Sequence, residues 1–233
     1  MKSKTVLISG GNSGLGFEIA KQLVKKNYQV IILGKDKNKL IQATKKLASS
    51  SVSYLLCDLR NYQNIKNIES KLMKVDILIN CAGIIAYQKL DQHDPEDIKD
   101  IINVNLLGTI FLTKAVYPHM KKRNDGTILN VSSTSGLATG GHPEESVYVA
   151  SKFGVSGFTN SLKKEVDAEK LNIKILGFYP GGMDTKFFTK SGTPKDTSNF
   201  MNPKEVAKIV VFILERPDSV KLDHVVVNRN KHT

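Results

Sequence analysis

The N-terminal part of the chain contains a short apolar run, a glycine-rich turn and a helix-like pattern in direct succession, which strongly restricts the possible folds. Residues 5–9 (TVLIS) are apolar and largely β-branched, as expected for a buried strand. Residues 10–16 read GGNSGLG, and apolar residues then recur at helical spacing from Phe17 to Val24. A strand, a glycine-rich turn and a helix in this order predict a binding site for the phosphates of a dinucleotide.

Each glycine of this turn has an expected role. Gly10 can adopt the tight turn, Gly14 lets the backbone approach a pyrophosphate, and Gly16 allows the helix to pack closely on the strand. The helix N-terminus offers unpaired N–H groups and a partial positive charge to phosphate. The spacing is GxxxGxG instead of GxGxxG, so an ordinary glycine-rich loop is the alternative interpretation.

Strand-like runs and helix-like patterns alternate along the rest of the chain. Strands are expected at residues 29–33, 53–58, 76–80, 126–131, 173–179 and 225–227. Helices are expected at about 37–48, from about 62, at 95–122 with a break near Asn103, at about 147–167 and at 203–215. This alternation predicts an α/β fold: a doubly wound, mostly parallel seven-stranded sheet with helices on both faces (a Rossmann fold), in a single domain spanning residues 1–233.

Composition excludes several classes of protein. Hydrophobic residues make up 40% of the chain, yet no run approaches the length of a membrane span, and the first residues do not resemble a signal peptide. Two cysteines, Cys57 and Cys81, indicate neither a disulfide framework nor a metal site, which favours the cytoplasm. The net charge of +12 comes from 30 Lys and 4 Arg that are scattered along the chain, so we expect neither a nucleic-acid nor a membrane partner.

The residues after the second strand bear on cofactor choice. Gly34 stands twenty residues after Gly14, where an NAD site would carry Asp or Glu for the ribose 2′-hydroxyl, and Lys35 follows it. Because no carboxylate repels a 2′-phosphate and an ammonium can pair with it, NADP(H) is preferred and NAD(H) remains possible. Alternatively, Lys35 is one more surface lysine. Asp36 is expected to cap the next helix.

Tyr148 and Lys152 are four residues apart on a predicted helix and therefore share one face. A cation near the phenol favours the phenolate and would lower the pKa of Tyr148 from about 10, so that the phenol can exchange a proton near neutral pH. The alternative is a packed aromatic ring beside a solvated lysine. The hydroxyls of residues 132–135 follow a predicted strand, at the sheet edge where ligands bind, and can hold a substrate oxygen or simply form a turn.

Two polar residues each allow two interpretations. Asn105 lies inside a predicted helix, where asparagine is unfavourable, so it either distorts the helix and frees a carbonyl for water or caps one of two helices. Asp58 ends the third strand, where it either accepts a hydrogen bond from an adenine amino group or caps the helix near Tyr62.

Taken in order, these patterns resemble the short-chain dehydrogenase/reductase family over almost the whole chain. The matching segments are residues 9–16 (SGGNSGLG), Asp58, 80–83 (NCAG), 103–105 (NVN), 130–136 (NVSSTSG), Tyr148 with Lys152, and 180–181 (PG). The chain departs from the family pattern in Ser9 for the usual Thr, in Cys81 for the usual Asn, in a wider gap between Ser133 and Tyr148, and in lacking a glycine-rich C-terminus.

The resemblance implies a role for each matching residue. Ser133 would hold the substrate carbonyl, and Tyr148 would give or take the proton. Lys152 would lower the Tyr148 pKa and bind the nicotinamide ribose, while Asn105 would hold a water in a proton relay. The residues expected to contact the cofactor are Gly10, Asn12, Ser13, Gly14, Leu15, Gly16, Lys35, Asp58, Leu59, Asn80, Ala82, Gly83, Tyr148, Lys152, Pro180, Gly181, Met183 and Thr185. No metal site is expected.

The implied activity is that of an NADP(H)-dependent oxidoreductase, which transfers a hydride between nicotinamide and the carbonyl or secondary alcohol of a small substrate. A 3-oxoacyl-carrier-protein reductase is the alternative, and a non-catalytic dinucleotide-binding regulator is the second. Residues 186–202 mix Phe, Thr, Ser, Gly and Pro and are expected to form a substrate flap. The resemblance also favours a homodimer or homotetramer.

Overall fold

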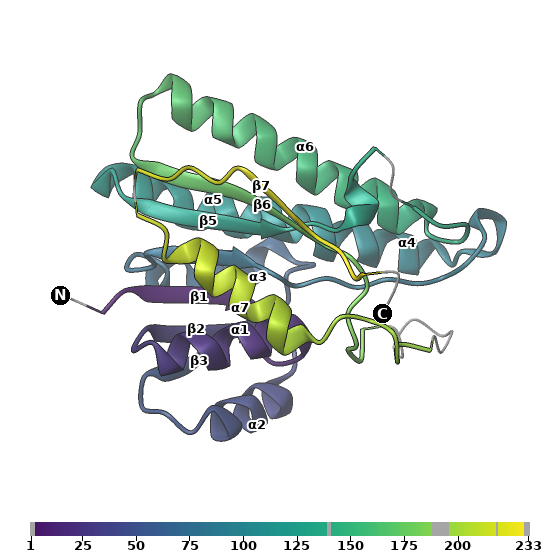
Figure 1. The fold of residues 1–233 in the computed structure, drawn as a ribbon, viewed down its shortest axis with the longest axis horizontal. Helices are drawn as coiled ribbons and strands as arrows, with labels where there is room; N and C mark the ends of the chain where they lie inside the picture. Colours follow the sequence, from purple (N-terminus) through teal and green to yellow (C-terminus); the bar gives the residue numbers. More distant parts are fainter. Residues whose placement is uncertain (1–2, 139–140, 188–195, 218, 231–233) are drawn as a thin grey trace.

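A seven-stranded parallel sheet forms the centre of the protein in the computed structural model, which describes residues 3–138, 141–187, 196–217 and 219–230 (Figure 1). The strands, in spatial order β3-β2-β1-β4-β5-β6-β7, are β1 (Thr5–Ser9), β2 (Gln29–Gly34), β3 (Val52–Leu56), β4 (Ile77–Asn80), β5 (Gly126–Val131), β6 (Ile173–Pro180) and β7 (His224–Val227). The helices are α1 (Gly14–Lys25), α2 (Lys37–Leu47), α3 (Tyr62–Ile68), α4 (Pro95–Ile102), α5 (Gly108–Arg123), α6 (Ser146–Ala168) and α7 (Pro203–Leu214). The predicted doubly wound fold is confirmed.

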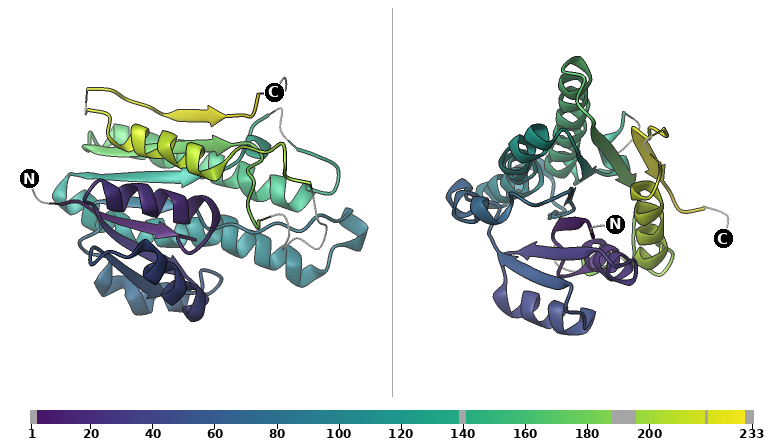
Figure 2. Two further views of the ribbon diagram at one scale, coloured as in Figure 1. Left: turned by 60° about the horizontal axis from the view of Figure 1, so that its bottom comes forward. Right: turned by 90° about the vertical axis from the view of Figure 1, so that its left-hand side faces the viewer.

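Helices cover both faces of the sheet because the strand residues alternate between two apolar cores. In β1, Val6 and Ile8 pack in the core that α1, α2 and α7 cover, whereas Leu7 packs in the core formed with α3, α5 and α6. Both faces of the central strands are therefore buried, as in most parallel sheets. Figure 2 shows the sheet between these two helix layers.

The direction of winding reverses between β1 and β4. From β1 the chain adds β2 and β3 on one side, and from β4 it adds β5, β6 and β7 on the other. In open α/β sheets the ligand crevice lies outside the carboxyl ends of the strands at such a reversal, so a crevice is expected at that edge of the sheet. The glycine-rich turn follows β1, and Gly83 lies just after β4.

Side-chain caps set several helix starts. The Asp36 carboxylate accepts from the Lys39 N–H at 3.0 Å, which confirms the predicted cap of α2. At α3, however, the cap is Asn61, which accepts from Gln63, so the suggestion that Asp58 caps this helix is wrong. The third strand also ends at Leu56 and does not reach the predicted residue 58.

The helical stretch Pro95–Arg123 is continuous and contains the predicted irregularity. A π-helical turn, Asn103–Leu107, joins α4 to α5, and Asn105 lies fully buried within it. The helix is therefore distorted at Asn105 rather than split and capped there. By length and composition this stretch could cross a membrane, although half of its most apolar window is buried inside the protein, as in a core helix.

Candidate active site

The structure brings Ser133, Tyr148, Lys152 and Asn105 together at the carboxyl edge of the sheet. Ser133 follows β5, Tyr148 and Lys152 project from consecutive turns of α6, and Asn105 comes from the π-helical turn. All four are buried, with exposed fractions of 8% or less. Gly83 faces this group, because a Cβ built at Gly83 would lie 3.5 Å from Asn105 Oδ1 and 3.7 Å from Lys152 Nζ.

The hydroxyls of Ser133 and Tyr148 form the centre of the group. The Ser133 hydroxyl lies close enough to the phenol to lower the pKa of Tyr148. The Ser133 Oγ also accepts from the Ser135 N–H at 3.1 Å, which fixes its position in the short turn Thr134–Gly136. The pair can therefore hold one oxygen atom of a substrate between a serine hydroxyl and a phenol.

The ammonium of Lys152 lies beside the phenol but does not bond to it. Its Nζ donates to the Val131 carbonyl at 3.0 Å and lies 5.7 Å from the centre of the Tyr148 ring. Burial raises the pKa of Tyr148 above its ordinary value, the Ser133 hydrogen bond lowers it, and the charge of Glu145 raises it. The expectation that Lys152 lowers the Tyr148 pKa is therefore wrong for the protein alone, because desolvation dominates.

Burial also changes the acidity of the lysine. It lowers the pKa of Lys152 to about 8, and neighbouring Cys81 has a smaller, opposite effect. The Cys81 thiol is partly buried, and desolvation raises its pKa to about 11 against the effects of Lys152 and of the Gly16 N–H. Cys81, which replaces the asparagine of the family pattern, is thus a neutral thiol packed between Lys152 and the start of α1.

Asn105 anchors the segment after β4. Its Oδ1 accepts from the Ile84 N–H at 2.8 Å, and its Nδ2 donates to the Ile84 carbonyl at 2.9 Å and to the Ser151 hydroxyl at 3.0 Å. The Asn105 carbonyl accepts from the Thr109 hydroxyl at 2.8 Å. The π-helical turn therefore does not leave this carbonyl free, although a second lone pair remains for a water.

The glycine-rich turn fits a pyrophosphate. Gly10 and Gly14 have positive φ angles of 69° and 54°, and a Cβ on Gly16 would lie 2.6 Å from the Gly10 carbonyl oxygen. Ser13 precedes α1 in an extended conformation without a side-chain cap, and the first turn has no acidic residue. The helix N-terminus therefore faces the crevice without a side chain that would compete with an anion.

The residues expected around the adenosine end are only partly available to a ligand. Lys35 is exposed beside Gly34. The Asp58 carboxylate, in contrast, accepts 2.6–3.1 Å hydrogen bonds from the Arg60 guanidinium, which also reaches Asp100 at 2.8 Å. Hydrogen bonds from Arg60 lower the pKa of Asp58, and the charge of Lys35 contributes in the same direction. Asp58 therefore already has a cationic partner.

Three other expected contacts point into the protein. The side chains of Leu15 and Leu59 lie in the two apolar cores. The Asn80 Nδ2 donates to Thr113 at 3.0 Å and to Asn130 at 2.8 Å in the interior. These residues can meet a cofactor through their backbone but not through their side chains. Ser9 supports the same region, because its hydroxyl accepts from the N–H groups of Cys81 and Ala82 at 3.0 and 3.1 Å.

The residues after β6 form the opposite side of the crevice. Pro180 ends β6, and Met183 pairs with Met201 in an isolated parallel bridge. A Cβ built on Gly14 would lie 3.6 Å from the Thr185 side chain, so this segment approaches the glycine-rich turn directly. Residues 188–195 of the predicted flap, 186–202, lie outside the described residues.

Sequence reasoning missed the wall that covers Tyr148. Ile85 and Tyr87 pack against Tyr148, and Phe187 meets its ring edge-on with centroids 6.1 Å apart. Glu145, which is 7% exposed, lies near Tyr87, and the Ser135 hydroxyl donates to its Oε2 at 3.4 Å. No local pattern indicated this wall, because its residues come from segments that are far apart in the sequence.

Comparisons with known proteins agree with this geometry. The short chain dehydrogenase family model matches residues 4–196. An uncharacterized oxidoreductase of Staphylococcus aureus is 28% identical over 235 residues, covering 97% of both chains. Among solved structures, ElxO with NADP bound superposes with a TM-score of 0.85 at 29% identity, covering 97% of this chain and 98% of that one.

The fold itself is shared with more distant proteins. The closed form of a serine dehydrogenase complexed with NADP+ superposes with a TM-score of 0.88 at 24% identity, covering 96% of this chain and 94% of that one. Because the family model covers most of the sequence and the relatives are oxidoreductases, the chain belongs to the short-chain dehydrogenase/reductase family of oxidoreductases.

Proposed function

We propose that this protein transfers a hydride between NADP(H) and the carbonyl or secondary alcohol carbon of a small substrate. The observation that carries the proposal is the buried group of Ser133, Tyr148 and Lys152, which lies at the same carboxyl edge of the sheet as the glycine-rich turn. A phosphate site beside a paired serine and phenol is suited to hold a dinucleotide and the oxygen of a carbonyl compound at once.

The nicotinamide and four residues of the site have separate roles in the proposed reaction. The nicotinamide supplies or accepts the hydride. Ser133 orients the substrate oxygen, and Tyr148 donates its proton to that oxygen in reduction and removes it in oxidation. Lys152, fixed by the Val131 carbonyl, is the residue that would bind the ribose hydroxyls. Asn105 holds the Ile84 backbone in place and offers its remaining carbonyl lone pair to a water.

The preference for NADP(H) over NAD(H) rests on Lys35. Its exposed ammonium adjoins Gly34, a position without the carboxylate that would repel a 2′-phosphate. ElxO, which was solved with NADP bound, gives independent support because it shares 29% of its residues with this chain. NAD(H) would serve less well.

The surroundings of Tyr148 favour a substrate with an apolar part. Ile85, Tyr87 and Phe187 surround the phenol, and Phe187 belongs to the segment 186–202 that we propose as a substrate flap. We also propose a cytoplasmic homodimer or homotetramer. Membership of the short-chain dehydrogenase/reductase family supports an assembly.

The decisive experiment is a panel of small aldehydes and ketones with NADPH consumption as the readout, run in parallel with NADH. At least one apolar carbonyl compound should be reduced, and faster with NADPH. The Tyr148→Phe variant serves as the matched control for background oxidation. If the wild-type protein oxidises NADPH no faster than this variant with any compound of the panel, the proposal is wrong.

A further inference from the structure

An arginine at the adenosine end of the crevice takes no part in the chemistry described above. Arg60 lies in the turn between β3 and α3, and its side chain is 36% exposed. Its Nη2 donates to Asp58 Oδ2 at 2.6 Å, and its Nε donates to both oxygens of Asp58 at 3.0 and 3.1 Å. Its Nη1 donates to Asp100 Oδ2 at 2.8 Å. Arg60 therefore links the turn after β3 to α4 through two carboxylates.

The contacts of Arg60 are better suited to orient a side chain than to stabilise the fold. Exposed ion pairs usually contribute about 1 kcal/mol or less. The backbone of the turn is held by other groups, because Leu59 lies in an apolar core and the Cys57 N–H donates to the Gly34 carbonyl at 2.9 Å. A guanidinium that spans both oxygens of a carboxylate fixes the plane of that carboxylate. Arg60 therefore sets the direction of the Asp58 side chain.

Arg60 does not use every acceptor position of this carboxylate. Three of its N–H groups donate to Asp58, namely the backbone N–H to Oδ1 at 3.1 Å and the N–H groups of Nε and Nη2. A carboxylate has about four positions at which it can accept a hydrogen bond. The Asp58 side chain is also 25% exposed. A donor group of a ligand can therefore bond to Asp58 while Arg60 holds it.

The position of Asp58 in the fold indicates which donor this is. β1, β2 and β3 are neighbours in the sheet, and the glycine-rich turn, Lys35 and Asp58 follow their carboxyl ends in that order. In a dinucleotide site the first turn holds the pyrophosphate, and the end of the second strand meets the adenosine ribose. The base then lies toward the third strand. Adenine carries an amino group, which is a hydrogen-bond donor that a carboxylate accepts.

We infer that Arg60 is a positioning residue of the cofactor site, which together with Asp100 holds the Asp58 carboxylate in the direction needed to accept a hydrogen bond from the adenine amino group. The inference rests on the proposed function for the presence of the dinucleotide. It concerns the binding of the adenine base alone, so it can be measured without a carbonyl substrate.

The test compares NADPH with its deamino analogue, nicotinamide hypoxanthine dinucleotide phosphate, in which an oxygen replaces the adenine amino group. Fluorescence titration gives the dissociation constant of each compound, and the ratio of the two constants is the readout. A change in protein charge acts equally on the phosphates of both compounds, so the ratio reports recognition of the base. The wild type should bind NADPH about fivefold or more tightly than the analogue. Equal affinities in the wild type overturn the inference.

Arg60→Met removes the guanidinium and keeps an unbranched apolar side chain. The ratio should fall to about half of the wild-type value or less, and Asp58→Ala should bring it to about one. Lys99→Met is the matched control, because it removes one positive charge from an exposed position of α4 beside Asp100, and it should keep the wild-type ratio. A purely structural role of Arg60 would weaken both compounds equally. An unchanged ratio in Arg60→Met, or an equal fall in Lys99→Met, therefore overturns the inference.

Far-UV circular dichroism shows whether Arg60→Met is folded. If it is not, Asp100→Ala is titrated instead, because this change removes one contact of Arg60 and leaves its bonds to Asp58 in place. The ratio should fall in the same direction but by less than in Asp58→Ala. A wild-type ratio in Asp100→Ala would then overturn the inference.

The outcome is separate from that of the carbonyl panel. A protein that discriminates between the two compounds as expected but reduces no carbonyl compound would refute the proposed function alone. An active reductase whose ratio does not respond to Arg60→Met would refute only the positioning role. A protein that binds neither compound would refute both.

Discussion

The amide of Asn105 pairs with the backbone of Ile84 in both directions, donating to its carbonyl at 2.9 Å and accepting from its N–H at 2.8 Å. The two residues are 21 positions apart in the chain. The Asn105 side chain makes the pair of hydrogen bonds with the Ile84 backbone that a neighbouring strand would make in a sheet. It joins the π-helical turn to the wall beside Tyr148. Loss of the Asn105 amide should therefore lower both the stability and the activity of the protein.

Replacing Asn105 with Ala leaves the Ile84 N–H and carbonyl without this partner in a part-buried region. We expect the free energy of unfolding to fall by about 2–4 kcal/mol, because buried polar groups would lose their hydrogen bonds. Urea unfolding followed by far-UV circular dichroism measures this change. Asn38→Ala, at an exposed position of α2, is the control and should change stability by less than about 0.5 kcal/mol.

Tyr148→Phe removes the proton donor and keeps the ring that packs against Ile85 and Phe187. The turnover number with the best carbonyl substrate should fall about 100- to 10,000-fold, which is the usual contribution of general acid catalysis. NADPH affinity, measured by fluorescence titration, should change little. Tyr54→Phe is the control, since Tyr54 lies on β3 away from the site. Full activity in Tyr148→Phe would contradict the assignment.

The strands were predictable because each is a short apolar run between glycine, asparagine or charged residues. Buried parallel strands give a strong local signal, so β1 through β6 begin within two residues of the expected positions. The end of the third strand was placed two residues too late. Beyond Leu56 the chain turns so that Asp58 can bond to Arg60, and apolar periodicity does not show this turn.

The long-range pairs could not be predicted from local patterns. Arg60 bonds to Asp100, which is 40 positions away in the sequence, and Asn105 bonds to Ile84, which is 21 positions away. Only the folded chain brings the members of these pairs together. The direction of the Tyr148 pKa shift was predicted wrongly for a related reason. Helical spacing showed a nearby cation but not the burial of the phenol, and burial is the largest influence on its pKa here.

Lys152 should lower the stability of the protein at neutral pH. Its pKa is about 8 in the folded protein and about 10.4 in an unfolded chain, so the folded state binds fewer protons between these values. The lysine's contribution to stability therefore rises as pH increases through this window and is least favourable below pH 8, where the buried side chain must carry a charge.

We expect Lys152→Met to be more stable than the wild type at pH 7 by about 1–2 kcal/mol, after the lost hydrogen bond to Val131 is allowed for. The difference should shrink as pH rises from 8 to 10. Urea unfolding of both proteins at pH 7 and pH 9.5 measures it. A wild type that is the more stable protein at pH 7 would contradict this reasoning. Lys152→Met should also lose most of its activity. A residue that lowers the stability of the fold but is needed for function is an example of the trade-off between stability and activity.

Lys35→Ala should distinguish the two nicotinamide cofactors. An exposed ammonium beside a 2′-phosphate forms a charge-assisted contact that NADH cannot make, so NADPH affinity should fall about fivefold or more while NADH affinity changes less than about twofold. Fluorescence titrations at low and high salt measure both affinities, and the NADPH effect should weaken with salt because exposed charges are screened.

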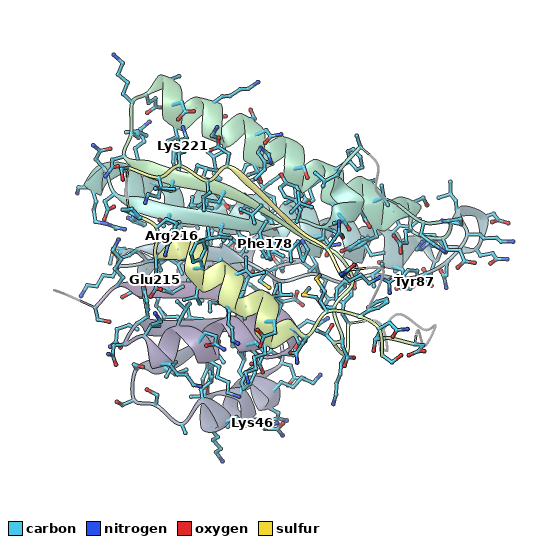
Figure 3. All side chains as sticks on the ribbon, viewed as in Figure 1. Lys46, Tyr87, Phe178, Glu215, Arg216 and Lys221 are labelled. Carbon is cyan, nitrogen blue, oxygen red and sulfur yellow. The ribbon has the colours of Figure 1, made fainter. Side chains whose placement is uncertain are left out.

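Lys46→Ala, at the far end of α2, removes an equal charge and should leave both affinities unchanged (Figure 3). Equal losses for NADPH and NADH in Lys35→Ala would show that this lysine does not recognise the 2′-phosphate.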